Sequence, residues 1–324
     1  MTVKTVLRAA AGLSIVGGLA AGAAMAAGGG GPTIEQQKWS FGGVRGHFDR
    51  AQLQRGFQVY KEVCASCHSM NRISFRNLSQ PGGPEFPEDG VKNLASTYQV
   101  VDGPNDQGKM FKRPAKPSDP IPSPFDNEQQ ARSANNGALP PNLSLIARAR
   151  GIEVEKPFWM VPVHMVKDIG TGYQEAGADY VYALLTGYAD VPAYKNENGH
   201  LVLIPAAQAK GDKAALRCAT VDRGEPGKPD VCNKLGDGMN YNVYFPGNQI
   251  AMAPPLQDGQ LKYSDKSPET VAQYAKDFAA FSAWAADPKL EERKRIGLMS
   301  MLYLLITTVL LYFAKKRIWS KVPH

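Results

Sequence analysis

Cys64-Ala65-Ser66-Cys67-His68 is the stretch of this 324-residue chain around which we expect the rest to fold. The spacing C-x-x-C-H is typical of the covalent attachment of a c-type haem. Two thiols at this spacing can each add across a vinyl group of one porphyrin, and the histidine is placed to bind the iron. The alternatives are a redox pair or half of a zinc site. A zinc site needs a second Cys/His pair at comparable spacing, which Cys218 and Cys232 do not provide, so the motif favours one haem c per chain.

The N-terminus has the pattern of a secretory signal. Lys4 and Arg8 precede an apolar run from Ala9 to Ala24, and Ala24-Met25-Ala26 resembles a cleavage site. We therefore predict a signal peptide over residues 1–26. Covalent haem attachment in bacteria follows export, so the signal and the haem motif support each other.

Near the other end, Ile296 to Ala314 is an uncharged run between two basic triplets, Arg293-Lys294-Arg295 and Lys315-Lys316-Arg317. As a helix this run covers roughly 28 Å, enough to cross the hydrocarbon core of a bilayer. A buried core helix is the alternative, which the basic flanks disfavour. Both flanks are basic, so the cleaved signal, rather than charge, orients the chain with its body in the periplasm.

These segments divide the chain into a periplasmic haem domain over 27–290, an inner-membrane anchor helix over 291–314 and a cytoplasmic tail over 315–324. The formal net charge is +7, of which the first 26 residues contribute two and residues 291–324 contribute five. The exported body is thus neutral, and nothing in it favours a nucleic-acid partner.

The body is expected to be mainly helical with long irregular loops, because glycine and proline are frequent and strand-like alternation is scarce. Asp49 and Gln52 resemble a capping box, and a helical stripe follows, so this helix ends at the haem motif. Its members are Leu53, Phe57, Tyr60 and Cys64.

A second helix is expected to begin at Ser267-Pro268 and to run to Asp287-Pro288. Its stripe is expected to pack against the first helix and the haem, and it consists of Val271, Tyr274, Phe278, Phe281 and Trp284. Shorter helices are expected over Asp179 to Gly187 and over Glu128 to Asn135.

The function depends on what binds the iron opposite His68. An open position permits oxygen or peroxide chemistry, whereas a second protein ligand leaves electron transfer. The candidates are His47, His164, His200, His324, Met70, Met110, Met160, Met165, Met239, Met252, Met299 and Met301. Met70 is too close to His68, and the last two methionines lie in the anchor. Met252 has the best local argument, because a proline-stiffened loop loses less entropy when it holds a ligand, but an ordinary core methionine remains the alternative for every candidate.

Several blocks together resemble cytochrome c1, the haem-bearing subunit of the cytochrome bc1 complex, in its bacterial form. The resemblance extends from about Phe41 through the anchor, in order. The blocks are Glu62-Val63-Cys64-Ala65-Ser66-Cys67-His68-Ser69-Met70, Met110-Phe111-Lys112-Arg113-Pro114, Ala134-Asn135-Asn136-Gly137-Ala138-Leu139-Pro140-Pro141-Asn142-Leu143-Ser144 and Ile250-Ala251-Met252-Ala253-Pro254-Pro255.

The resemblance implies a class I c-type cytochrome fold with one C-terminal transmembrane helix. It implies thioether links at Cys64 and Cys67, and His68 and Met252 as the axial pair. It further implies a haem propionate partner at Arg150 and pocket-lining positions at Asn135, Pro140, Pro141 and Tyr180.

Two features depart from the shorter members of the family. Ile152 to Gly177 is an insertion without an assigned role. Cys218 and Cys232 lie in an extended loop and match a pair found in some bacterial members. In an oxidising compartment they are expected to form a disulfide, which would contribute roughly 3 kcal/mol and steady the loop leading to Met252.

The implied function is that of a redox subunit of a quinol:cytochrome c reductase that transforms no substrate itself. It would carry single electrons from the Rieske iron–sulfur protein to a cytochrome c, alongside a cytochrome b subunit in a dimeric complex in the bilayer. Acidic residues that could steer a basic cytochrome c are Glu85, Glu88, Asp89, Asp102 and Asp106. The competing classes are an anchored electron carrier that serves an oxidase and a haem enzyme with an open iron.

Overall fold

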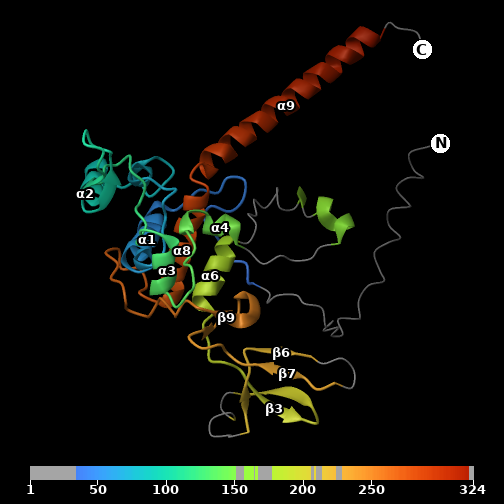
Figure 1. Ribbon diagram of the computed structural model, residues 1–324. Coiled ribbons are helices and arrows are strands. Elements are labelled where there is room, and N and C mark those ends of the chain that lie inside the picture. Colours follow the sequence, from blue (N-terminus) through green and yellow to red (C-terminus); the bar gives the residue numbers. More distant parts are fainter. Residues whose placement is uncertain are drawn as a thin grey trace, which may run out of the picture. The chain divides into compact units, whose positions relative to one another are not determined.

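Figure 1 shows the computed structural model of the chain, in which short helices alternate with long irregular connections. The structure describes residues 34–150, 157–163, 165–166, 177–205, 208, 214–223 and 228–320. They all belong to one compact unit, Gly31–His324. The predicted signal peptide and the candidate ligands His164 and His324 lie outside the described residues.

The α-helices in the described part are α1 (Arg50–Glu62), α2 (Glu88–Ser96), α3 (Glu128–Ala134), α4 (Ile146–Ala149), α6 (Gly177–Thr186), α8 (Val271–Ala286) and α9 (Leu290–Trp319). Single 3-10 turns are η2 (Cys64–Ser66), η3 (Phe75–Ser79), η4 (Leu143–Leu145), η5 (Phe158–Met160) and η6 (Pro246–Asn248). The helices predicted at α1, α3, α6 and α9 are confirmed.

Short antiparallel strands are more numerous than the sequence suggested. They are β1 (Gln99–Asp102), β2 (Phe111–Pro114), β3 (Ala193–Glu197), β4 (His200–Ile204), β5 (Leu216–Arg217), β6 (Thr220–Asp222), β7 (Val231–Asn233), β8 (Asn240–Tyr241) and β9 (Gln249–Ile250). β1 pairs with β2, β3 lies between β4 and β5, β6 pairs with β7, and β8 pairs with β9. Each is five residues or shorter, at or below the short end of the range over which period-two alternation predicts a strand.

Helix α1 begins directly after Asp49, whose side chain accepts a hydrogen bond from Gln52 N at 3.2 Å. This confirms the predicted N-cap. In a capping box the Gln52 side chain would bond back to the backbone of Asp49. Here it donates instead to Asp277 of α8, at 3.2 Å. The predicted apolar stripe faces the core, with Leu53, Phe57 and Tyr60 all buried.

Helix α8 starts at Val271, so the predicted start at Ser267-Pro268 is wrong. Thr270 is the N-cap, and its hydroxyl accepts from Gln273 N at 3.3 Å. Ser267 N instead donates to the Asp265 carboxylate at 3.0 Å, which holds this residue in a turn ahead of the helix. Serine and threonine are comparable caps, and the local turn at Asp265 leaves the later one, Thr270, to cap the helix.

The two helices cross at Gly56 of α1. A Cβ atom at this position would lie 2.2 Å from Asp277 O and 2.6 Å from Phe281 Cβ. Phe281 also packs against Phe57 with ring centroids 5.7 Å apart and against Tyr60 at 6.2 Å. The predicted packing of the second stripe against the first helix is therefore confirmed, at a separation that only glycine permits.

A buried ion pair lies beside this crossing. The Asp277 side chain is fully buried and accepts from Arg55 Nε at 2.9 Å and from Gln273 Nε2 at 2.8 Å. Arg55 also reaches Asp265, with an N–O distance of 2.6 Å. A buried charge is tolerated when it is paired and hydrogen-bonded in this way.

Helix α9 is attached to the segment before α1 at its first turn. Leu290 is fully buried. Glu291 accepts two bonds from the Arg50 guanidinium, both at 2.8 Å, and one from Phe48 N at 2.7 Å. Lys294 Nζ donates to Phe41 O at 2.5 Å. The membrane-anchor candidate is therefore joined to the segment that begins α1.

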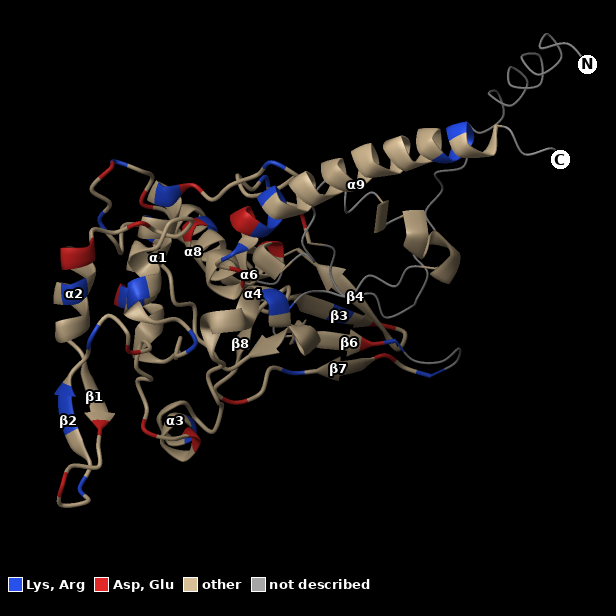
Figure 2. Cartoon of the chain, turned by 90° about the horizontal axis from the view of Figure 1, so that it is seen from above, with Lys and Arg blue, Asp and Glu red and all other residues tan. Residues whose placement is uncertain are grey.

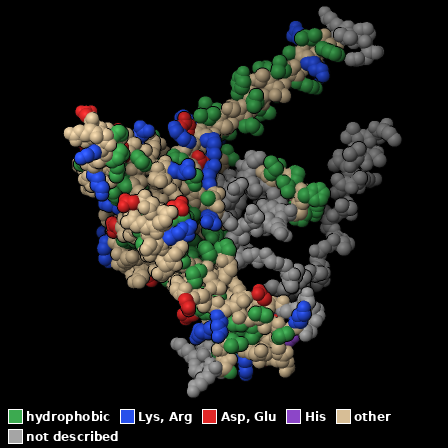
Figure 3. Space-filling model, in the orientation of Figure 1, with side chains coloured by type: hydrophobic (Ala, Val, Ile, Leu, Met, Phe, Trp, Pro, Cys, Tyr) green, Lys and Arg blue, Asp and Glu red, His purple; other side chains and the backbone are tan. Residues whose placement is uncertain are grey.

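Beyond that turn α9 is apolar and exposed. Its most apolar window is 0 % buried, and it has the length and composition to cross a membrane. Figure 2 shows charged residues at both ends of α9 with an uncharged middle, and Figure 3 shows hydrophobic side chains along its length.

Candidate haem site

The Cys64 and Cys67 thiols lie on one tight turn at the end of α1. The helix closes at Val63, and the chain continues as the 3-10 turn η2. Cys67 N and His68 N both donate to Cys64 O, at 3.1 and 2.9 Å. Both cysteines are unpaired. The turn therefore presents two free thiols and an imidazole from neighbouring positions, the donor set that covalent haem attachment requires.

The surroundings of Cys64 are apolar. Burial, with a smaller effect of the Cys67 charge, raises the pKa of the Cys64 thiol to about 12. Within the described ranges, no group of three or more His, Cys, Asp or Glu residues is arranged to hold a metal ion. The thiols fit thioether formation better than metal binding.

The His68 imidazole is oriented by the backbone of the proline-rich loop. Nδ1 lies 2.8 Å from Pro141 O, and a carbonyl only accepts, so Nδ1 carries the proton. Burial lowers the pKa of His68, against the opposing effect of this hydrogen bond. The ring is therefore neutral with its Nε2 lone pair available, as an iron ligand requires.

The loop that carries Pro141 is fastened around the motif. Leu143 N donates to Ser69 O at 2.8 Å. Asn135 ends helix α3, and its side chain donates to Ala131 O at 2.7 Å. Asn136, with a φ of 52°, turns the chain toward the half-buried Pro140. The structure thus brings Pro141 to His68, while the Asn135 side chain is engaged in its own helix end.

Arg150 and Tyr180 lie near one another. Tyr180 is buried on α6, and burial raises its pKa while the positive charge of Arg150 acts in the opposite direction. Arg150 is exposed at the end of α4. The neighbouring Arg148 pairs with Asp287 at 2.9 Å, so of these two arginines Arg150 is the better placed to meet a ligand carboxylate.

The methionine candidates differ in their surroundings. Met70 is fully buried in the core, Met110 is 60 % exposed and Met165 is 58 % exposed. Met252 is half-buried and packs against the main apolar cluster. Met239 is also half-buried. Met160 is half-buried as well. Burial therefore separates Met160, Met239 and Met252 from the exposed Met110 and Met165, and contact with the main apolar cluster then favours Met252.

Sequence reasoning missed the residues that hold the backbone of Met252. The Tyr188 hydroxyl donates to Met252 O at 3.1 Å, across 64 positions of the chain. Asn242 is fully buried and joins the connection between β8 and β9, which precedes Met252, to the end of α6 through Leu184 O, at 2.8 Å. Neither residue belongs to a recognisable motif, so only the folded structure identifies them.

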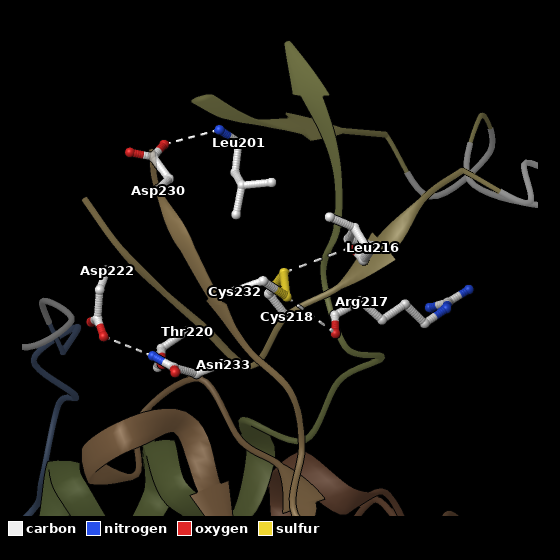
Figure 4. The surroundings of a disulfide bond; sticks show 9 residues. All are labelled: Leu201, Leu216, Arg217, Cys218, Thr220, Asp222, Asp230, Cys232 and Asn233. Atoms are coloured by element: carbon white, nitrogen blue, oxygen red, sulfur yellow. Dashed lines mark hydrogen bonds between the residues drawn. A yellow bond between two sulfur atoms is a disulfide. The ribbon is translucent and has the colours of Figure 1, made fainter. Parts of the chain in front are cut away.

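The disulfide between Cys218 and Cys232 is present, with the two Cα atoms 5.2 Å apart. Figure 4 shows it beside the β6–β7 pair, where Asn233 Nδ2 donates to the Asp222 carboxylate at 2.8 Å. Ala219 N donates to Asn233 O at 2.8 Å on the same ladder. The disulfide closes the chain segment between Cys218 and Cys232, which precedes the Met252 loop.

Most of the acidic residues considered for partner docking already interact with other parts of the chain. Glu85 pairs with Arg50 at 2.9 Å, and Asp102 pairs with Arg113. Glu88 and Asp89 lie in the first turn of α2, where acidic side chains stabilise the helix terminus. Local interactions therefore account for four of these five residues.

Comparison with known proteins agrees with this geometry. The model of the Cytochrome C1 family matches residues 39–322. A protein named cytochrome b/c1 from Bradyrhizobium diazoefficiens is 45% identical over 87% of this chain, which spans 35% of that relative's length. Cytochrome c1 from Blastochloris viridis is 42% identical over 99% of this chain and 98% of the relative. Cytochrome c1 from Rhodospirillum rubrum is 39% identical over 94% of each. The chain belongs to the cytochrome c1 family.

Proposed function

We propose that this chain accepts single electrons from a Rieske iron–sulfur protein and passes them to a cytochrome c. Membership of the cytochrome c1 family supports the broader statement that it is a haem-bearing electron-transfer subunit of the bc1 complex. The covalently bound haem c supplies reversible one-electron chemistry. The residues of the chain hold this group, exclude small molecules from its iron and tune its potential.

The proposed ligand set consists of Cys64 and Cys67 as thioether links, with His68 and Met252 as axial ligands. The observation that supports the His68 role is the 2.8 Å hydrogen bond between His68 Nδ1 and Pro141 O, which leaves Nε2 free to bind a metal. Met252 is half-buried and packs against the main apolar cluster. A thioether opposite an imidazole raises the reduction potential, which suits an acceptor of electrons from a Rieske centre.

In the same proposal Arg150 pairs with a haem propionate, and Tyr180, Asn135, Pro140 and Pro141 line the pocket. A guanidinium facing a carboxylate in a partly dry site would help to set the potential. Arg148 already pairs with Asp287, which supports Arg150 as the partner of the propionate.

We further propose that residues 27–290 lie in the periplasm, that 291–314 anchor the chain in the inner membrane and that 315–324 lie in the cytoplasm, after removal of 1–26. The single candidate span among the described residues supports the anchor. The joint between Glu291 and Arg50 would then fix the angle between the haem domain and the membrane.

The proposed partners are a cytochrome b subunit, the Rieske protein and a soluble or tethered cytochrome c, in a dimeric complex within the lipid bilayer. The relative named cytochrome b/c1, of which this chain spans 35%, supports a close association with cytochrome b.

The test of the ligand set is Met252→Leu in the purified complex, with Met239→Leu as the matched control. We expect Met252→Leu to abolish the methionine-to-iron absorption band and to lower the midpoint potential, because leucine offers no lone pair. Met239→Leu is expected to change neither. If Met252→Leu leaves band and potential intact, the axial assignment is wrong.

A further inference from the structure

Met252 lies in a part of the chain that has no regular structure to hold it. Strand β9 ends at Ile250, and the following residues up to Leu256 belong to no helix or strand. A ligand in such a loop keeps its position only through contacts made by other segments, because the local backbone supplies few restraints. The contacts that hold this loop therefore bear directly on the ligand.

One of these contacts comes from the end of α6. The helix ends at Thr186, and Tyr188 follows two residues later. Its hydroxyl donates to Met252 O at 3.1 Å. The Tyr188 backbone is fixed as well, because it forms a β-bridge with Asn242. The phenol thus links a helix end to the ligand residue itself.

Asn242 fastens the connection between β8 and β9, which leads into the Met252 loop, to the same helix end. Its side chain donates to Leu184 O at 2.8 Å and accepts from Tyr244 N at 3.0 Å. Val243 N donates to Gly187 O at 3.0 Å. A Cβ atom on Gly187 would lie 2.5 Å from the Tyr244 ring, so the loop lies directly against the helix end.

Helix α6 is a firm support for this loop. Asp179 in its first turn is buried and accepts from Trp39 Nε1 at 2.7 Å and from Gln37 N at 2.9 Å. Val181 and Leu185 belong to the main apolar cluster. A hydrogen bond from a fixed helix end restrains a loop more than one from another loop would.

We propose that Tyr188 is a positioning residue for Met252, holding its carbonyl so that the sulfur stays bound to the iron. The inference rests on the proposed ligand role of Met252. Asn242 supports the same position indirectly, because it docks the preceding β8–β9 connection on α6. Loss of the Tyr188 hydroxyl would favour an alternative state, in which the Met252 loop moves away and the iron is open to small ligands.

The test is Tyr188→Phe in the complete complex, which removes the hydroxyl and keeps the ring. A typical hydrogen bond corresponds to about a fivefold change in an equilibrium, so we expect about a fivefold larger fraction of molecules without bound methionine. The readouts are a weaker methionine-to-iron band, a lower midpoint potential and faster carbon monoxide binding to the reduced protein. Tyr182→Phe, on the preceding helix α6, is the matched control and should match the wild type.

The outcomes separate this inference from the ligand assignment. If Met252→Leu abolishes the band and Tyr188→Phe matches the wild type, the positioning role is wrong and the ligand assignment stands. If neither variant changes the band, the ligand assignment fails first. A Tyr188→Phe chain that cannot incorporate haem also contradicts the inference, because a role limited to Met252 leaves attachment at Cys64 and Cys67 intact.

Discussion

His68 and Met252 are held in contrasting ways. His68 directly follows a turn fixed by helix α1, which itself crosses α8 at Gly56, and its ring is oriented by one backbone carbonyl at 2.8 Å. Met252 lies in an irregular loop that is tied by side chains to the end of α6. The histidine side therefore depends on helix packing, whereas the methionine side depends on a few polar contacts. We expect the methionine side to open first under stress.

The largest effect is expected from breaking the packing on the histidine side. Arg55→Met leaves the buried Asp277 carboxylate without its ion-pair partner, and we expect a loss of about 3–5 kcal/mol in the free energy of unfolding. Denaturant unfolding monitored by haem absorbance measures it.

The matched control is Lys262→Met, because Lys262 is 81% exposed in its pair with Glu269. Pairs of this kind contribute about 0–1 kcal/mol. Equal losses in Arg55→Met and Lys262→Met would contradict the importance assigned to the α1–α8 crossing.

A smaller effect, confined to the methionine side, is expected from removing the disulfide. The double change Cys218→Ser and Cys232→Ser frees an excursion of 14 positions, with a loss of roughly 3 kcal/mol in chain-entropy terms. We expect Met252 to be held less firmly and the midpoint potential to fall, which a redox titration measures. The histidine side should be unaffected, so haem should remain attached. An unchanged potential with an intact methionine-to-iron band defeats this prediction.

The smallest effect is expected away from both ligands, at the β1–β2 hairpin. A hydrogen bond from Arg113 lowers the pKa of Asp119 to about 2 from its ordinary 3.8. A lowered carboxyl pKa stabilises the fold above the ordinary value, and that stability is lost as the pH falls from about 4 to about 2. Denaturation midpoints across this range should fall less steeply for Asp119→Asn than for the wild type. Added salt should shrink the difference, since the pair is near the surface.

The control for this comparison is Asp126→Asn, which changes an exposed carboxylate further along the loop. Its midpoints should follow the wild type through the acid range. A pH dependence that persists in Asp119→Asn would assign the acid sensitivity to other groups.

The sequence predicted most of the histidine side because its signals are local. Five adjacent residues define the attachment turn, and the stripe of Leu53, Phe57 and Tyr60 repeats at helical spacing. The N-cap at Asp49 was also predicted correctly. The start of α8 was not, because Ser267 and Thr270 are comparable as caps and Ser267 is held by a local hydrogen bond to Asp265, which the spacing of apolar residues does not reveal.

The methionine side escaped prediction for the opposite reason. Met252 was proposed as a ligand from its proline-rich loop and from family resemblance, but its hydrogen-bond partner Tyr188, 64 positions away, was not foreseen. Asn242 reads as an ordinary loop asparagine, although it is fully buried. Periodicity reports which residues share a face of one element, and it carries no information on which loop meets which helix end. Strands as short as β8 and β9 also show no period-two pattern in the sequence.

The central claim is that His68 and Met252 together close the iron to small molecules. The most direct measurement is the absorption spectrum of the purified, reduced wild-type protein before and after the addition of carbon monoxide. We expect a low-spin c-type spectrum that carbon monoxide does not change. A colourless protein, or a spectrum that shifts promptly when the gas is added, would contradict the account.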